Sequence, residues 1–117
     1  MPQTIAQILE KMKEVIEKNE TRSPGWWLDE AMKLAVLRQD LQAEMVKAEI
    51  KFRNEIILLA ADFPYNKAEN MAKGRVLREG ETMTAYEWYR YLTTRDKVVE
   101  EILRIAKKRA AIPDSYS

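Results

Sequence analysis

The chain has 117 residues, with 20 Lys and Arg against 19 Asp and Glu, so its formal net charge is only +1. It contains no Cys and no His, which excludes disulfides, Cys or His metal sites, a Cys nucleophile and a His general base. No apolar run approaches the roughly 20 residues that a membrane-spanning helix needs, so we expect no membrane partner.

The first predicted element is a helix over residues 5–18. Thr4 followed by Gln7 has the spacing of a capping box, and Asn19 is a plausible end. Apolar side chains recur every three or four positions on one face: Ile5, Ile8, Leu9, Met12, Val15 and Ile16. Residues 1–4 lack the basic and apolar stretches of a signal peptide, so we expect none.

The second predicted element is a helix over residues 24–62, about 55 Å long. Ser23 and Pro24 are typical of an N-cap and a first helical position. A three–four repeat runs through Trp27, Ala31, Leu34, Leu41, Met45, Ala48, Phe52 and Leu59. Arg38 and Glu55 interrupt this repeat. Other apolar residues widen the stripe until it should contact more than one neighbour: Leu28, Met32, Ala35, Val46, Ile56, Ile57 and Ala60.

A shorter helix is predicted over residues 67–78, after Pro64 ends the long one. Asn66 and Glu69 have capping-box spacing, Gly74 weakens the helix, and Gly80 is expected to stop it.

The last predicted helix covers residues 85–110. Thr84 and Glu87 open it, and Asp96 breaks an apolar stripe of Ala85, Tyr89, Leu92, Val99, Leu103, Ala106 and Ala110. The sequence therefore predicts an all-α fold: a long antiparallel helical hairpin with a short N-terminal helix packed on it. Residues 1–112 are expected to form a single helical domain, and residues 113–117 a flexible tail. Because the long helix outruns its partners, we expect a homo-oligomer.

Six aromatic residues are candidate partner-binding residues: Trp26, Trp27, Tyr86, Trp88, Tyr89 and Tyr91. Consecutive helical positions differ by about 100°, so the four rings of residues 86–91 do not all face one core. Tyr and Trp are enriched in interfaces because they combine a large apolar area with a polar group. The alternative is a crowded helix junction for residues 86–91 and a helix-start packing role for residues 26 and 27.

Charge is unevenly distributed along the chain. Residues 1–65 hold nine basic and eleven acidic residues, a net charge of −2, whereas residues 66–110 hold eleven and seven, a net charge of +4. Seven cations are candidate nucleic-acid-binding residues: Arg75, Arg78, Arg90, Arg95, Lys107, Lys108 and Arg109. The favoured alternative is a solvated face, with the last three opposing a helix dipole.

Carboxylates on two of the helices are the remaining candidates for chemistry. Glu10, Glu14 and Glu17 on the first helix, with Asp40 and Glu44 on the second, raise the possibility of an Mg²⁺-dependent nucleotide hydrolase. Their spacings do not match the E-E-x-x-E and E-x-x-D patterns of all-helical pyrophosphatases. No Ser has a base partner and no Gly-rich phosphate loop exists, so we expect a non-enzyme without metal or cofactor.

Several segments resemble small helical early proteins of unknown function from tailed bacteriophages. The resemblance covers residues 26–110: a long charged helix, then KAENMAK at 67–73, YRYL at 89–92 and VVEEILR at 98–104. It implies an accessory protein of the host cytoplasm and assigns no active residues. The sequence thus predicts a non-enzymatic interaction protein that self-associates and binds a protein partner. The alternative is a nucleic-acid-associated accessory protein that uses the basic aromatic half.

Overall fold

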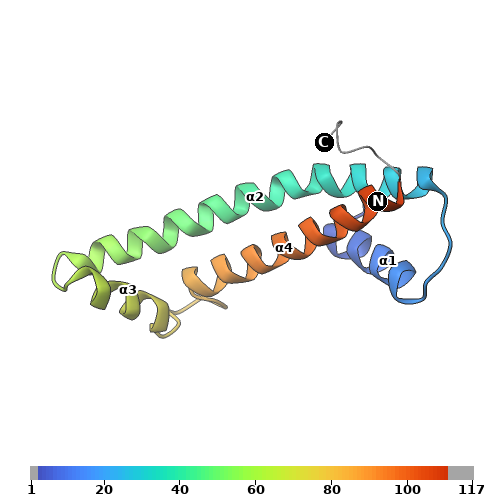
Figure 1. The fold of residues 1–117 in the computed structure, drawn as a ribbon. Coiled ribbons are helices and arrows are strands. Elements are labelled where there is room, and N and C mark those ends of the chain that lie inside the picture. The colour runs from blue at the N-terminus through green and yellow to red at the C-terminus, as the bar shows by residue number, and fades with distance from the viewer. Residues whose placement is uncertain (1–2, 111–117) are drawn as a thin grey trace. The chain divides into compact units, whose positions relative to one another are not determined.

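The computed structural model describes residues 3–110, and this part of the chain is all-helical, without a strand. Its helices are α1 (Ile5–Glu17), α2 (Pro24–Ala60), α3 (Tyr65–Gly74) and α4 (Ala85–Arg109), as labelled in Figure 1. The predicted tail at 113–117 lies outside the described residues. None of the helices within residues 3–110 is long and apolar enough to cross a membrane.

Contacts divide the chain into two compact units. Unit 1 combines Met1–Asp40 with Asp96–Ser117, and unit 2 is Leu41–Arg95. Both α2 and α4 therefore contribute one part to each unit.

Local capping explains where α1 begins and ends. The backbone N–H of Gln7 donates to Thr4 Oγ1 at 3.2 Å, and the Thr4 N–H donates to Gln7 Oε1 at 2.9 Å, which confirms the capping box. At the other end, Asn19 has a positive φ of 51°. The Asn19 and Glu20 N–H groups donate back to Ile16 and Val15, which satisfies carbonyls that a helix end otherwise leaves free.

Helix α2 is continuous from Pro24 to Ala60, which confirms the prediction of one long helix. Its start is fixed by Ser23, whose Oγ accepts the Trp26 N–H at 3.1 Å. At its end, the N–H groups of Asp62 and Phe63 both donate to the Leu59 carbonyl, and Pro64 follows.

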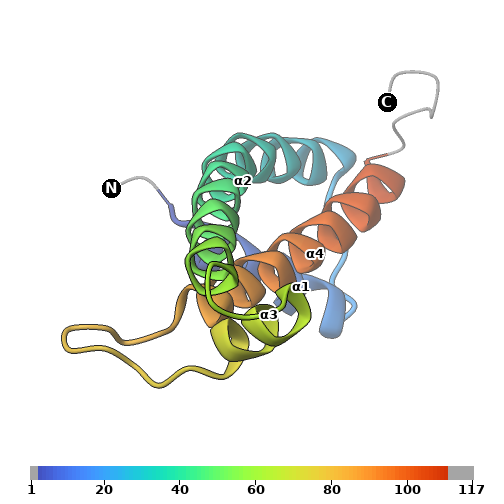
Figure 2. The ribbon, with the colours of Figure 1, turned by 90° about the vertical axis from the view of Figure 1, so that its left-hand side faces the viewer.

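The prediction for α3 was wrong at both ends. The helix begins at Tyr65 with Pro64 as its N-cap residue and no side-chain cap, so Asn66 and Glu69 form no capping box. It ends at Gly74 rather than near residue 78, because Arg75 is extended, with φ −65° and ψ 153°. Figure 2 shows the connection that follows as a long loop. Within it, Gly80 has φ +84°, a conformation that glycine adopts without strain.

Unit 1 buries apolar side chains from α1, α2 and α4. They are Ile8, Leu9, Met12, Val15, Trp27, Ala31, Leu34, Val99, Ile102 and Ala106. An ion pair between Lys11 Nζ and Glu30 Oε2 at 2.8 Å joins α1 to α2 inside this unit. Burial acts to raise the pKa of Glu30, but the hydrogen bonds from Lys11 and Lys33 outweigh it, so that pKa lies below its ordinary value.

A core cluster of unit 2 forms where α2, α3 and α4 meet. Its buried members are Phe52, Ile56, Ala68, Ala72 and Ala85, with Leu59, Ala60 and Tyr86 packed against them. Leu41, Ala48 and Leu92 of the same unit are also buried. Small alanines on α3 let it approach the larger rings of its neighbours closely. The Thr84 Oγ1 accepts the Glu87 N–H at 3.1 Å, which confirms the predicted start of α4.

Candidate interaction surfaces

Unit 1 exposes apolar side chains on α2 beside the buried ones. Leu28, Met32 and Val36 follow one another at four-residue intervals and are 40%, 61% and 64% exposed. On a helix this spacing places them on a common face, different from the face that buries Trp27, Ala31 and Leu34. Helix α2 therefore presents a second apolar surface that its own unit does not cover.

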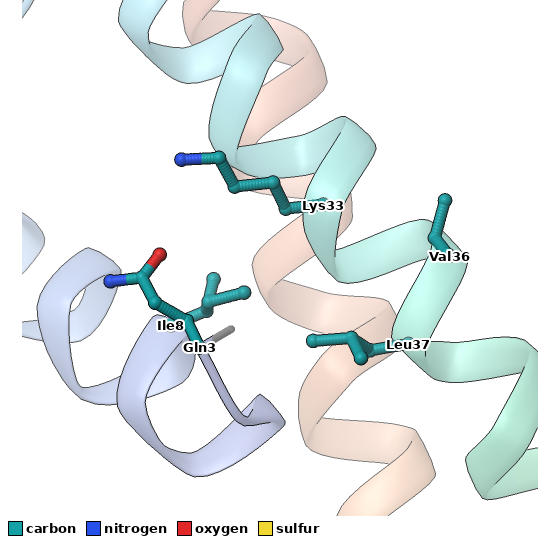
Figure 3. Close-up of a pocket in the computed structure, with 5 residues that line it drawn as sticks. All are labelled: Gln3, Ile8, Lys33, Val36 and Leu37. Atoms are coloured by element: carbon teal, nitrogen blue, oxygen red, sulfur yellow. The ribbon is translucent and has the colours of Figure 1, made fainter. Parts of the chain in front are cut away.

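An open groove lies at the edge of this surface, between α1 and α2. It encloses about 400 Å³ and is lined by Gln3, Ile8, Lys33, Val36 and Leu37. In Figure 3 the Leu37 side chain points from α2 toward Ile8 and Gln3. The groove therefore connects the exposed apolar residue Val36 of α2 with Ile8 of α1.

The part of α2 in unit 2 also exposes apolar residues. Val46 and Ile50 are four residues apart and are 56% and 55% exposed, and Ile57 is 64% exposed. Ile56, which the sequence placed in the same widened stripe, is buried instead. Exposed branched side chains at such spacing are typical of helices that pack against a further helix.

The two adjacent tryptophans have different environments. Trp27 is buried, with its ring 4.9 Å from that of Trp26 in an edge-on arrangement and the Arg109 guanidinium 5.1 Å from its centre. Trp26 is half-buried and lies beside Arg22. Trp27 therefore belongs to the buried core of unit 1, whereas Trp26 is the more accessible ring of the two.

The four rings of residues 86–91 separate into two pairs within unit 2. Tyr86 and Tyr89 are half-buried and line a small cavity together with Tyr65. Trp88 and Tyr91 are exposed and stacked, with ring centres 5.5 Å apart and planes inclined by 16°. The segment thus divides between a cavity wall and an outer face, as the helical spacing requires.

The polar residues that interrupt the apolar repeats pair with one another or with loop residues. Arg38 on α2 contacts Asp96 on α4 through Nε–Oδ1 at 2.8 Å and Nη2–Oδ2 at 3.2 Å. Glu55 accepts two hydrogen bonds from Arg75, which also donates two to Glu81. These interruptions are therefore structural ion pairs inside each unit.

The seven candidate cations for nucleic acid are not equally accessible. Arg75 is only 13% exposed and is held by two carboxylates, so it is not a free phosphate ligand. The Arg90 guanidinium lies over the Tyr86 ring and the Arg95 guanidinium over the Tyr91 ring. Lys107, Lys108 and Arg109 occupy the last turn of α4, where they oppose the helix dipole.

The acidic candidates do not gather. In the part of the chain that the structure describes, no group of three or more Asp and Glu side chains could hold a metal ion. Glu14 pairs with Lys18 at 2.7 Å, and Glu17 lies 3.9 Å from Lys13.

Sequence reasoning missed two kinds of residue. Val36 and Ile50 are exposed apolar residues that continue a second three–four repeat on α2, and counting that repeat from Met32 would have found them. Tyr65 follows the proline that ends the long helix, and nothing in the local pattern around Tyr65 indicates that it meets residues of α4.

No protein-family model matches this sequence, and neither curated proteins nor solved structures show significant similarity to it. The resemblance to phage early proteins therefore stays a prediction, and function has to be argued from the surfaces themselves.

Proposed function

We propose that this chain is a non-enzymatic helical interaction protein that self-associates and binds a protein partner. The observation that carries the proposal is the exposed apolar surface of α2, represented by Met32 and Val36 in unit 1 and by Val46 and Ile50 in unit 2. Exposed apolar side chains that recur at helical spacing are typical of surfaces that another protein covers. The resemblance to phage accessory proteins, with a location in the host cytoplasm, fits this role.

We also propose the long antiparallel hairpin as the scaffold of this surface. Within unit 1, Trp27 near the start of α2 contacts Arg109 at the end of α4, and Arg38 farther along α2 contacts Asp96 earlier on α4. The pairing runs in opposite directions along the two helices, which supports an antiparallel arrangement there. In unit 2, the Phe52 and Tyr86 rings lie 5.1 Å apart.

The size of the surface favours weak, concentration-dependent self-association. The residues on α2 that are more than half exposed include Met32, Val36, Val46, Ile50 and Ile57. Covering such a side chain is worth about 1–1.5 kcal/mol, so two copies would gain roughly 10–15 kcal/mol. The loss of translational and rotational freedom costs about 4–15 kcal/mol, which leaves a modest net affinity.

The test is the molar mass in solution as a function of concentration. Light scattering and sedimentation equilibrium on the full chain are expected to show an oligomer at micromolar concentration. Val36→Lys should shift the equilibrium toward monomer, because the charge must be desolvated in the interface. Val98→Lys is the matched control, since Val98 is an exposed valine of unit 1 on α4. A monomer across the micromolar range contradicts self-association.

A second candidate function is association with nucleic acid. It is supported by the exposed stack of Trp88 and Tyr91, because aromatic faces stack on bases of single strands. Arg95 donates to the Tyr91 hydroxyl at 3.5 Å and brings a cation beside the rings.

Binding of labelled single- and double-stranded DNA at low salt tests this second function. Affinity should fall steeply as salt is raised, and Trp88→Ala should weaken binding of the single strand. The absence of binding at low salt removes this candidate and leaves the first one untouched.

A further inference from the structure

The cavity in unit 2 is built by three helices that bring distant tyrosines together. It encloses about 200 Å³. Its lining residues are Glu49, Phe52, Arg53 and Ile56 from α2, Tyr65, Glu69 and Lys73 from α3, and Tyr86 and Tyr89 from α4. Phe52 and Ile56 are buried core residues, whereas the tyrosines are half-buried or exposed. An apolar floor with phenol groups around it suits a flat ring that carries a polar edge.

The charges in the lining are already matched. Arg53 Nε donates to Glu49 at 3.0 Å, and Lys73 Nζ donates to Glu69 at 3.2 Å, each pair being four residues apart on one helix. The hydrogen bond to Glu49 raises the pKa of Arg53 above its ordinary value. A phosphate would have to displace a carboxylate from each cation, which disfavours an anionic ligand.

A cationic ligand is disfavoured for a different reason. The face of the Tyr86 ring already has two cations near it, with Lys73 Nζ 5.5 Å and the Arg90 guanidinium 5.7 Å from the ring centre. A further positive charge at this ring would be repelled by both. The electrostatics therefore leave a neutral ligand.

The volume of the cavity sets the size of that ligand. Pockets that hold a whole small molecule usually enclose about 300–1,000 Å³, and this one is smaller. It has room for one aromatic ring rather than for a base, sugar and phosphate together. Aromatic side chains set into pockets are the residues that carry most of the affinity in protein interfaces.

We propose that the cavity lined by Tyr65, Tyr86 and Tyr89 receives one neutral aromatic side chain, a Trp or a Tyr, from the protein partner. This inference rests on the proposed function, because the aromatic side chain would belong to the protein partner proposed there. It names a site apart from the apolar residues of α2 that are proposed to support self-association.

The test uses the full chain with ¹³C-labelled tyrosine rings and two probes, N-acetyltryptophanamide and N-acetyltyrosinamide. Titration followed by NMR should move the ring signals of Tyr65, Tyr86 and Tyr89, whereas the signal of Tyr91, which is not part of the cavity lining, should stay in place. N-acetylleucinamide and adenosine are the comparison probes and are expected to leave the cavity tyrosines unperturbed.

Two variants refine the result. Tyr65→Ala removes one wall at the exposed start of α3 and should weaken binding of the aromatic amides about 2–10-fold. Val76→Ala, at an exposed position outside the cavity lining, is the control and should leave the affinity unchanged. The titration is repeated in the Val36→Lys chain, so that loss of self-association and loss of ring binding are seen separately.

Four outcomes overturn the inference. The first three are an absence of shifts with both aromatic amides, equal shifts with the leucine amide, and shifts confined to Tyr91. The fourth is stronger binding of adenosine than of either amide, which would favour a nucleobase as the ligand.

Discussion

Arg38 and Asp96 lie 58 residues apart in the sequence, and their side chains form a two-pronged ion pair between α2 and α4. Both side chains are largely enclosed, with 24% and 13% of their surfaces exposed. The hydrogen bonds that Arg38 donates to Asp96 raise the pKa of its guanidinium above the ordinary value. Planar guanidinium and carboxylate groups match in this geometry, which fixes the register of the two helices in unit 1.

Removing one partner of this pair should therefore destabilise the chain. Asp96→Ala leaves the Arg38 guanidinium partly buried without its main partner and should lower the free energy of unfolding by about 2 kcal/mol. Replacing both residues together, as Arg38→Met with Asp96→Leu, should recover most of the loss. Urea denaturation of the single and double variants measures the coupling free energy between Arg38 and Asp96. If the losses of unfolding free energy in the two single variants simply add in the double variant, the proposed coupling is wrong.

The Glu81 carboxylate makes stability depend on pH. Hydrogen bonds from the Arg75 side chain and the Arg78 backbone N–H lower its pKa from 4.5 to about 2. Because the pKa is lower in the folded chain, the stabilisation is complete above pH 4.5 and is lost as the pH falls toward 2.

Thermal denaturation from neutral to acidic pH is expected to show this loss in the wild type. Glu81→Gln should be less stable at neutral pH, and the difference from wild type should narrow as the pH falls. Glu79→Gln, at an exposed position in the same loop, should follow the wild type throughout. A difference between wild type and Glu81→Gln that stays constant with pH would contradict the assignment.

Loss of the cap at Thr84 should weaken the start of α4. Thr84 is 1% exposed, and its hydroxyl satisfies the Glu87 N–H. Thr84→Ala is expected to cost about 1–2 kcal/mol, whereas Thr94→Ala, at an exposed position inside the same helix, should be close to neutral. Chemical denaturation measures both variants. A Thr84 variant as stable as the Thr94 variant would show that the cap contributes little.

Truncation to alanine should affect two nearby residues of α2 differently, one through the stability of the chain and the other through its self-association. Leu34 is fully buried, so Leu34→Ala should cost about 2–5 kcal/mol through lost burial and the cavity left behind. Met32 is 61% exposed, so Met32→Ala should change the stability of the monomer by less than about 0.5 kcal/mol. Met32→Ala should instead weaken self-association in sedimentation experiments. Equal losses of stability in the two variants would mean that the assignment of faces is wrong.

Features with local causes could be predicted from the sequence. The caps at Thr4, Ser23 and Thr84 each depend on a side chain and an N–H three positions later, and all three form. The same reasoning predicted the wrong start for α3. Pro64 precedes this helix without a side-chain cap, and Asn66, the expected cap residue, already lies inside it.

Features that need two distant segments could be predicted only in part. Arg38 and Asp96 were recognised as interruptions of apolar repeats, but their pairing depends on the register of α2 against α4, which neither repeat specifies. Tyr86 was recognised as a candidate residue, whereas its neighbour in the cavity, Tyr65, belongs to a helix whose position depends on the loops around it. Exposure of Val36 likewise depends on which neighbours cover α2.

The double ion pair of Arg75 has a consequence for how this chain can diversify. Charge, rather than burial of its own side chains, positions the loop after α3, where Val76 is 85% exposed. In saturation mutagenesis, almost any residue at position 76 should therefore leave the stability of the fold unchanged. Even lysine at position 75 should lower that stability, because an ammonium does not reproduce the planar set of hydrogen bonds that a guanidinium makes. The exposed side chain at position 76 can therefore vary during evolution, while Arg75 continues to hold the loop in place.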